Sequence, residues 1–171
     1  CDVINMSFGM DKSLTNKTLQ LSVAYAIQNG CIVVAAVGND GSTKEYYPAK
    51  YDNVIGVGSI NESKSRSWFS QYNSTVDLVA PGESIQSISI EGYNKDSGTS
   101  FSAPHISAIA AIAKCINKEI TTQNTPQGER QKASLFRRLE QPRSVLNIKF
   151  FAPLSFKKEN HRRTPKKQSD K

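Results

Sequence analysis

The residues best suited to chemistry lie in SGTSFSAPH, residues 97–105. Gly98 frees the backbone, and Ser100 stands where a helix rich in small residues begins. A serine hydroxyl attacks a carbonyl only when a base takes its proton. The start of a helix favours the negative charge that such an attack creates. The pattern predicts a nucleophilic serine, with a simple helix cap as the alternative role of Ser100.

Neither histidine of the sequence is a good candidate for that base. His105 follows Ser100 by five residues on the same expected helix, which is about 500° of rotation, so the side chains point about 140° apart. His161 lies between Asn160 and Arg162 with no carboxylate placed beside it. We therefore expect the base to lie outside these 171 residues or to be absent.

Two other kinds of site that use serine or glycine do not match this sequence. The nucleophile turn of α/β-hydrolases is G-x-S-x-G, and Ser102 occupies the place of its second glycine. A phosphate-binding loop needs a Gly-rich segment that ends in GK[ST], and the sequence has none. Neither of these two sites accounts for Ser100.

The elements around Ser100 alternate between strands and helices. Continuous apolar runs predict buried strands at 2–9, 31–39, 53–60, 74–82 and 84–90. Helical spacing predicts one helix over 13–30 and another from Ser100 to about residue 116. The second is apolar nearly all round, so we expect it to be central and buried. Strand, helix and strand at this spacing predict an α/β fold with a parallel sheet.

Charge divides the chain in two. Residues 1–113 carry 7 Lys and Arg against 10 Asp and Glu, a net −3, whereas residues 114–171 carry 15 against 5, a net +10. We expect residues 1–120 to be the folded part and 121–171 to be a basic extension, partly helical and then disordered. The extension lacks interleaved aromatics, so nucleic-acid binding is not favoured. No apolar run approaches the roughly 20 residues of a membrane span.

Several blocks, taken in order, resemble the subtilases, the subtilisin-like serine proteases of peptidase family S8. The most specific are VVAAVGNDG, SWFSQYN, LVAPG and SGTSFSAPH, and the resemblance runs from residue 1 to about 116. It implies the subtilisin-like three-layer fold and a serine-type endopeptidase that works through an acyl-enzyme. It also implies a peptide or protein substrate and an extracellular location.

The resemblance assigns roles residue by residue. Ser100 matches the nucleophile, and Asn39 matches the side chain that stabilises the oxyanion together with the Ser100 N–H. A strand edge that binds an extended peptide is matched by Ser7, Phe8 and Gly9. One wall of the pocket for the residue before the cleaved bond is matched by Ala35, Ala36, Val37 and Gly38. A weak calcium site on backbone carbonyls is expected near Ala49, Tyr51 and Val54.

The resemblance is incomplete on its N-terminal side. Subtilases carry their catalytic Asp and His before the nucleophile, in an Asp-x-Gly after an early strand and a His-Gly-[ST] at a helix start. Neither motif occurs there in this sequence. We expect the chain to lack that part of the catalytic domain and to be nearly inactive alone. The alternative is a non-catalytic subtilase-like domain that binds peptides or a partner protein.

Overall fold

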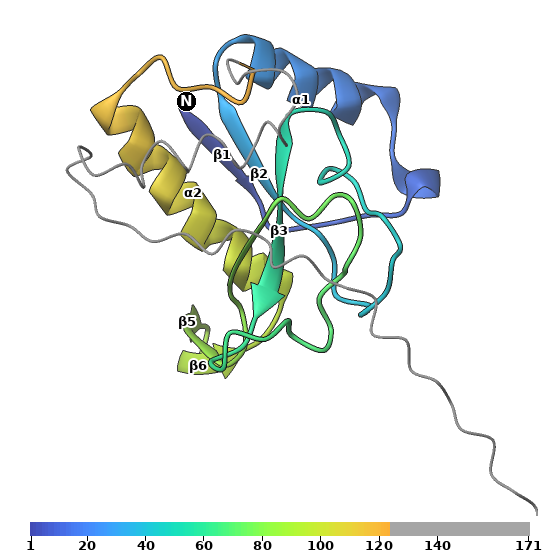
Figure 1. Ribbon diagram of the computed structural model, residues 1–171, viewed down its shortest axis with the longest axis vertical. Coiled ribbons are helices and arrows are strands. Elements are labelled where there is room, and N and C mark those ends of the chain that lie inside the picture. The colour runs from blue at the N-terminus through green and yellow to red at the C-terminus, as the bar shows by residue number, and fades with distance from the viewer. Residues whose placement is uncertain (124–171) are drawn as a thin grey trace, which may run out of the picture.

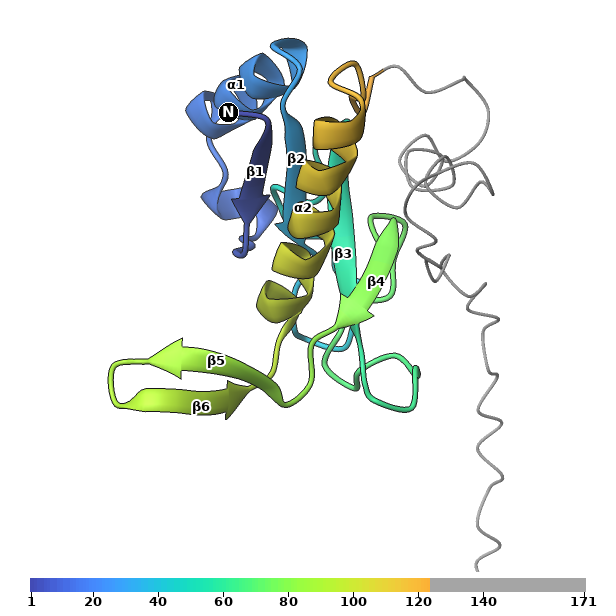
Figure 2. The same cartoon turned by 90° about the vertical axis from the view of Figure 1, so that its left-hand side faces the viewer.

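Four strands form one parallel sheet, and the two long helices lie on its opposite faces (Figure 1 and Figure 2). The computed structural model describes residues 1–123. The strands are β1 Val3–Met6, β2 Ile32–Ala36, β3 Val54–Ile60 and β4 Leu78–Pro81, in this order across the sheet. The helices are α1 Lys17–Gln28 and α2 Thr99–Ile116, and a short 3₁₀ turn, η1, spans Lys12–Leu14.

Two further strands stand apart from the sheet. β5 Ile85–Ser89 and β6 Gly92–Asp96 pair antiparallel and form a hairpin that projects from the body of the molecule (Figure 2). The hairpin leads directly into the start of α2. Every residue of β6 is exposed. Because this segment is polar and has no apolar alternation, the sequence did not predict it as a strand.

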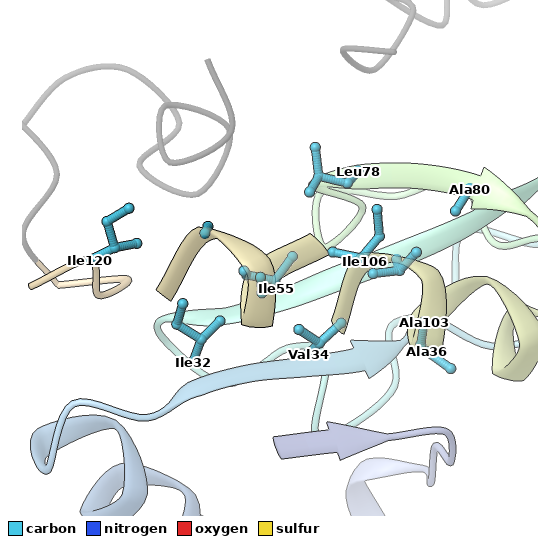
Figure 3. Packing of buried hydrophobic residues seen from close by; sticks show 12 residues of the cluster. Ile32, Val34, Ala36, Ile55, Leu78, Ala80, Ala103, Ile106 and Ile120 are labelled. Carbon is cyan, nitrogen blue, oxygen red and sulfur yellow. The ribbon is translucent and has the colours of Figure 1, made fainter. Parts of the chain in front are cut away.

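The alternation of side chains along β2 divides the core into two layers. Ile32, Val34 and Ala36 pack with α2, as Figure 3 shows, whereas Val33 and Ala35 pack with α1. All residues of β2 and β3 are buried, as central strands of a parallel sheet covered on both faces should be. The predicted three-layer α/β fold is confirmed.

The predicted strands are correct in position, and 53–60 ends where predicted, but 74–82 begins only at Leu78. The prediction that 84–90 is buried is wrong, because β5 belongs to the exposed hairpin. Two runs are too long at their C-terminal ends. The run 2–9 is a strand only to Met6, and the run 31–39 only to Ala36. The residues that follow each strand turn away from the sheet at the same edge, because the strands are parallel. Ligand sites of open α/β sheets lie at this edge.

α1 is shorter than the predicted helix because two polar side chains set its beginning. Asp11 caps η1 through the Ser13 amide, and Asn16 caps α1 by accepting a hydrogen bond from the Leu19 amide at 2.8 Å. The helix ends before Gly30, whose φ of +82° suits glycine.

The prediction that the helix after Ser100 is buried all round is wrong for the part of the chain that the structure describes. The sheet packs against one side of α2, where Ala103, Ile106 and Ala110 are buried. The opposite side, including Ile112 and Ile116, is exposed. The predictions for residues 124–171 lie outside the described residues, and the boundary near residue 120 stays a prediction.

Candidate active site

Ser100 lies in the first turn of α2 and is linked to the end of β1 by two hydrogen bonds. Its Oγ donates to the Ser7 carbonyl at 2.9 Å, and the Ser7 hydroxyl donates to the Ser100 carbonyl at 2.7 Å. Both residues are half-buried. This reciprocal pair joins segments 93 residues apart and holds the start of α2 against the end of β1.

Asn39 reaches the start of the same helix from the loop after β2. Its Oδ1 accepts hydrogen bonds from the Thr99 amide at 2.9 Å and from the Thr99 hydroxyl at 2.8 Å. An amide N–H needs an acceptor, so these contacts identify which end of the side chain is oxygen. The helix has no cap from its own Gly98, and Asn39 supplies one from a distant part of the chain.

The cap leaves the donor end of Asn39 available on the side of Ser100. A Cβ at Gly98 would lie 3.2 Å from Asn39 Nδ2, so glycine allows this amide to approach the helix start. The Ser100 N–H belongs to the first turn, whose amides have no partner within the helix. Asn39 Nδ2 and the Ser100 amide are therefore two donors at one helix terminus, where negative charge is favoured.

A cavity of about 370 Å³ opens at this point. Five residues that the sequence singles out line it: Gly9, Ala36, Gly38, Asn39 and Ser100. The other lining residues are Met10, Asp11, Leu14, Asp40, Tyr46 and Thr99. The predicted nucleophile, the predicted oxyanion donor and part of the predicted pocket wall thus share one cavity.

Four predicted substrate-binding residues do not line the cavity. Ala35 and Val37 are fully buried and pack in the layer against α1, because alternation along β2 sends their side chains away from Ala36. Ser7 touches Ser100 instead, and Phe8 is 45% exposed. A binding role for these four residues stays a prediction and would rest mainly on backbone groups.

His105 is placed as the helical spacing predicts. Its side chain is exposed, and its Nδ1 lies 2.8 Å from the Phe101 carbonyl of its own helix. His105 is the only histidine among residues 1–123, and His161 lies outside the described residues. In the described part of the chain, the Ser100 hydroxyl bonds to a backbone carbonyl and to no histidine.

Three polar residues that line the cavity, Tyr46, Asp40 and Asp11, and the neighbouring Lys44 were not singled out from the sequence. The Tyr46 hydroxyl bonds the Asp40 carboxylate, the Lys44 ammonium lies 5.1 Å from the centre of the Tyr46 ring, and Lys44 pairs with Asp11 at 2.8 Å. The Lys44 bond lowers the pKa of Asp11 to about 2. The bond to Asp40 raises the pKa of Tyr46 above its usual value. The only feature of the sequence that could have pointed to these four residues is that they follow β1 and β2.

Two observations on residues 1–123 concern metal-binding side chains and membrane spans. They contain no group of three or more His, Cys, Asp or Glu side chains that could hold a metal ion. No helix within residues 1–123 is long and apolar enough to cross a bilayer.

Comparison with known proteins identifies the relatives of this site. The sequence model of the subtilase family matches residues 1–145, beyond the point near residue 116 where the resemblance was expected to end. The thermophilic serine proteinase of Bacillus sp. strain AK1 is 45% identical over 112 residues, covering 65% of this chain and 27% of that protein. The major intracellular serine protease of Bacillus subtilis strain 168 is 39% identical over 134 residues, covering 75% and 41%.

Solved structures agree with the sequence relatives. A protease from Pseudoalteromonas arctica PAMC 21717 superposes with a TM-score of 0.67 at 32% identity, covering 71% of this chain and 41% of that one. The chain spans between about a quarter and two fifths of the length of the two sequence relatives. The family match covers most of the 171 residues and includes every residue of the cavity. The chain belongs to the subtilase family.

Proposed function

We propose that this chain carries the nucleophile and oxyanion hole of a serine endopeptidase that works through an acyl-enzyme. The observation that supports this most is the meeting of Asn39 and Ser100 at one helix start and one cavity. Ser100 Oγ bonds to the peptide carbonyl carbon while its proton passes to a base. The carbonyl oxygen becomes an oxyanion and accepts hydrogen bonds from Asn39 Nδ2 and the Ser100 N–H.

Collapse of the tetrahedral intermediate leaves the acyl-enzyme. The C–N bond breaks, and the base gives the proton to the leaving amine. Water then attacks the acyl ester by the same route and frees Ser100. The base is a histidine that residues 1–123 do not place at Ser100, since His105 is bonded to its own helix.

We propose that the 171-residue chain alone is a weak catalyst. Its Ser100 proton is directed at the Ser7 carbonyl, which cannot act as a base at neutral pH. Oxyanion donors without a base still retain part of the rate enhancement of serine proteases. We therefore expect slow acylation of Ser100 and not its complete absence.

A fluorophosphonate probe tests this directly. We expect slow labelling of the purified chain at Ser100, no labelling in Ser100→Ala, and normal labelling in the control Ser89→Ala, which alters an exposed serine of the hairpin. Labelling at the rate of an intact protease would contradict the weak-catalyst proposal.

The coding sequence upstream of residue 1 separates the protease from a binding domain. Asp-x-Gly and His-Gly-[ST] motifs in frame, with fast labelling of the joined polypeptide, support the protease. If the joined polypeptide carries neither motif and stays unreactive, the chain is a peptide-binding domain instead.

Calcium binding is a separate and weaker proposal. Without a suitable carboxylate cluster among the described residues, the donors would be the carbonyls of Ala49, Tyr51 and Val54. The Tyr51 carbonyl already accepts the Val54 N–H at 3.2 Å, although a carbonyl has two lone pairs. No reaction step uses this ion. A higher Tm in millimolar calcium than in chelator would support the site.

The compartment also stays a proposal. The resemblance favours an extracellular protein. One relative bears a name that places it inside the cell, so family membership does not decide the question for this chain. Fractionation of cells that produce the natural protein would decide it.

A further inference from the structure

We infer that Tyr46 forms the floor of the cavity and restricts the peptide residue before the cleaved bond to a small side chain. This inference rests on the proposed function, because it assumes that a peptide side chain enters the cavity beside Ser100. Asp40 and Lys44 contact Tyr46, and Asp11 pairs with Lys44. We call these four residues the floor cluster.

Tyr46 packs near two glycines that line the cavity. One is Gly38, after β2, where an added Cβ would lie 2.4 Å from Tyr46 Cδ2. The other is Gly9, after β1, where an added Cβ would lie 3.4 Å from Tyr46 Cβ. A side chain at Gly38 would therefore clash with the Tyr46 ring, whereas a Cβ at Gly9 would only make an ordinary contact with Tyr46 Cβ.

Gly38 is fitted to this contact in two ways. Its φ of +111° lies in the region that favours glycine, and its missing side chain leaves the volume that the Tyr46 ring fills. The buried Gln71 also approaches this point, because its Cγ lies 3.1 Å from the position of a Gly38 Cβ. The ring is therefore packed against a part of the chain that has little freedom to move aside.

Polar contacts hold the ring from several directions. The hydroxyl bonds Asp40, which follows β2, while Lys44 lies over the ring and pairs with Asp11, which follows β1. The loop that carries Lys44 is itself anchored, because Gln71 Nε2 donates to the Lys44 carbonyl at 3.1 Å. The floor cluster thus ties together the segments after β1 and β2.

A peptide side chain that enters beside Ser100 and Ala36 would meet this ring. A methyl or hydroxymethyl group can rest on it. An aromatic or long aliphatic group needs the space that Tyr46 fills, so it must displace the ring and break the bond to Asp40. The two acidic residues of the cluster already have partners, so the cavity is not prepared for a cationic side chain either.

Binding of product-like peptides tests the inference without requiring catalysis. Acetyl-Ala-Ala-Pro-X acids, with X = Ala, Phe or Lys, are titrated into ¹⁵N-labelled 171-residue chain, and amide shifts of Gly38, Asn39 and Ser100 are followed. Wild type should bind the Ala peptide about tenfold more tightly than the Phe peptide, the size of effect that pocket fit produces. Tyr46→Gly should reverse this order.

Two further variants complete the test. Tyr46→Phe keeps the ring and loses only the hydroxyl, so the preference for Ala should persist. Tyr93→Gly makes the same change on the exposed hairpin strand β6, and it should behave like wild type. If Tyr46→Gly does not fold, Tyr46→Leu, which removes the ring but keeps an apolar side chain, takes its place and should weaken the preference for Ala.

The possible failures are distinct. If no peptide shifts any of the three amides, the proposed function is overturned together with the inference. If peptides bind there, but Ala and Phe equally, or Lys best, or with an order unchanged in folded Tyr46→Gly, only the inference is overturned.

Discussion

The start of α2 and the floor of the cavity are held by different kinds of interaction. At the helix start, neutral hydrogen bonds join Ser100 to Ser7 and Thr99 to Asn39. At the floor, charged side chains, more than a third exposed in the Lys44–Asp11 pair, hold a tyrosine ring. The first arrangement resists changes in pH and salt, whereas exposed ion pairs are screened and titrate. Changes in pH and salt should therefore affect the floor cluster more than the start of α2.

Loss of the donor end of Asn39 should have the largest effect. Asn39→Asp keeps an oxygen for the Thr99 amide but removes Nδ2, so we expect probe labelling of Ser100 to fall by about 10²–10³, the magnitude found for such a donor in subtilisin. The free energy of unfolding should change by less than about 0.5 kcal/mol, since Asp is an equally good cap.

Asn39→Ala is the matched variant for the same position. It loses both the donor and the cap, so labelling should fall as in Asn39→Asp, and stability in urea should also fall by about 1 kcal/mol. If Asn39→Asp labels like wild type, Asn39 is only a cap, and the contrast between the two regions disappears.

Loss of the Ser7 hydroxyl should have an intermediate effect. Ser7→Ala removes the bond to the Ser100 carbonyl and should lower the free energy of unfolding by about 1 kcal/mol in urea titrations. Ser13→Ala, an exposed serine of η1, is the control and should cost less. An equal loss of unfolding free energy in both variants would show that the hydrogen bond between Ser7 and the start of α2 contributes no special stability.

The smallest expected differences between the two regions are in their response to pH. Because the folded pKa of Asp11 lies at about 2, below its ordinary 3.8, its ion pair is complete above pH 4 and is lost as the pH falls through about 2. A ¹³C titration of the Asp11 carboxyl group should show this value, and Lys44→Met should return it toward 3.8. An unchanged pKa in Lys44→Met would remove Lys44 as the cause.

The bond at the Tyr46 hydroxyl should persist to high pH. Asp40 raises the pKa of Tyr46, so this bond is present below the ordinary tyrosine pKa of 10 and is lost only as the pH rises through the higher folded value. Ultraviolet titration should therefore find one tyrosine fewer ionising in the normal range in wild type than in Asp40→Ala. Identical titration curves would contradict the Tyr46–Asp40 contact.

Much of the scaffold could be predicted because its signals are local. The apolar runs of β2 and β3, and the small residues after Ser100, specify strands and a helix over a few residues each. The ends of β1 and β2 were misjudged, because apolar residues such as Phe8 and Val37 continue each run after the strand has ended. Where a strand leaves the sheet depends on its neighbours and not on its own letters.

The sequence by itself determined the order of the four sheet strands and the two long helices along the chain. It also determined that Gly98 precedes the helix and that Ser100 stands at its start. Tertiary structure alone decided that Asn39 caps a helix 60 residues away and that Tyr46 lies between Gly9 and Gly38. It also decided that one side of α2 stays exposed in the described chain. The reason is that the spacing of apolar residues indicates which side of each segment is buried. Contacts between distant loops depend on residues that are far apart in the sequence and share no local pattern.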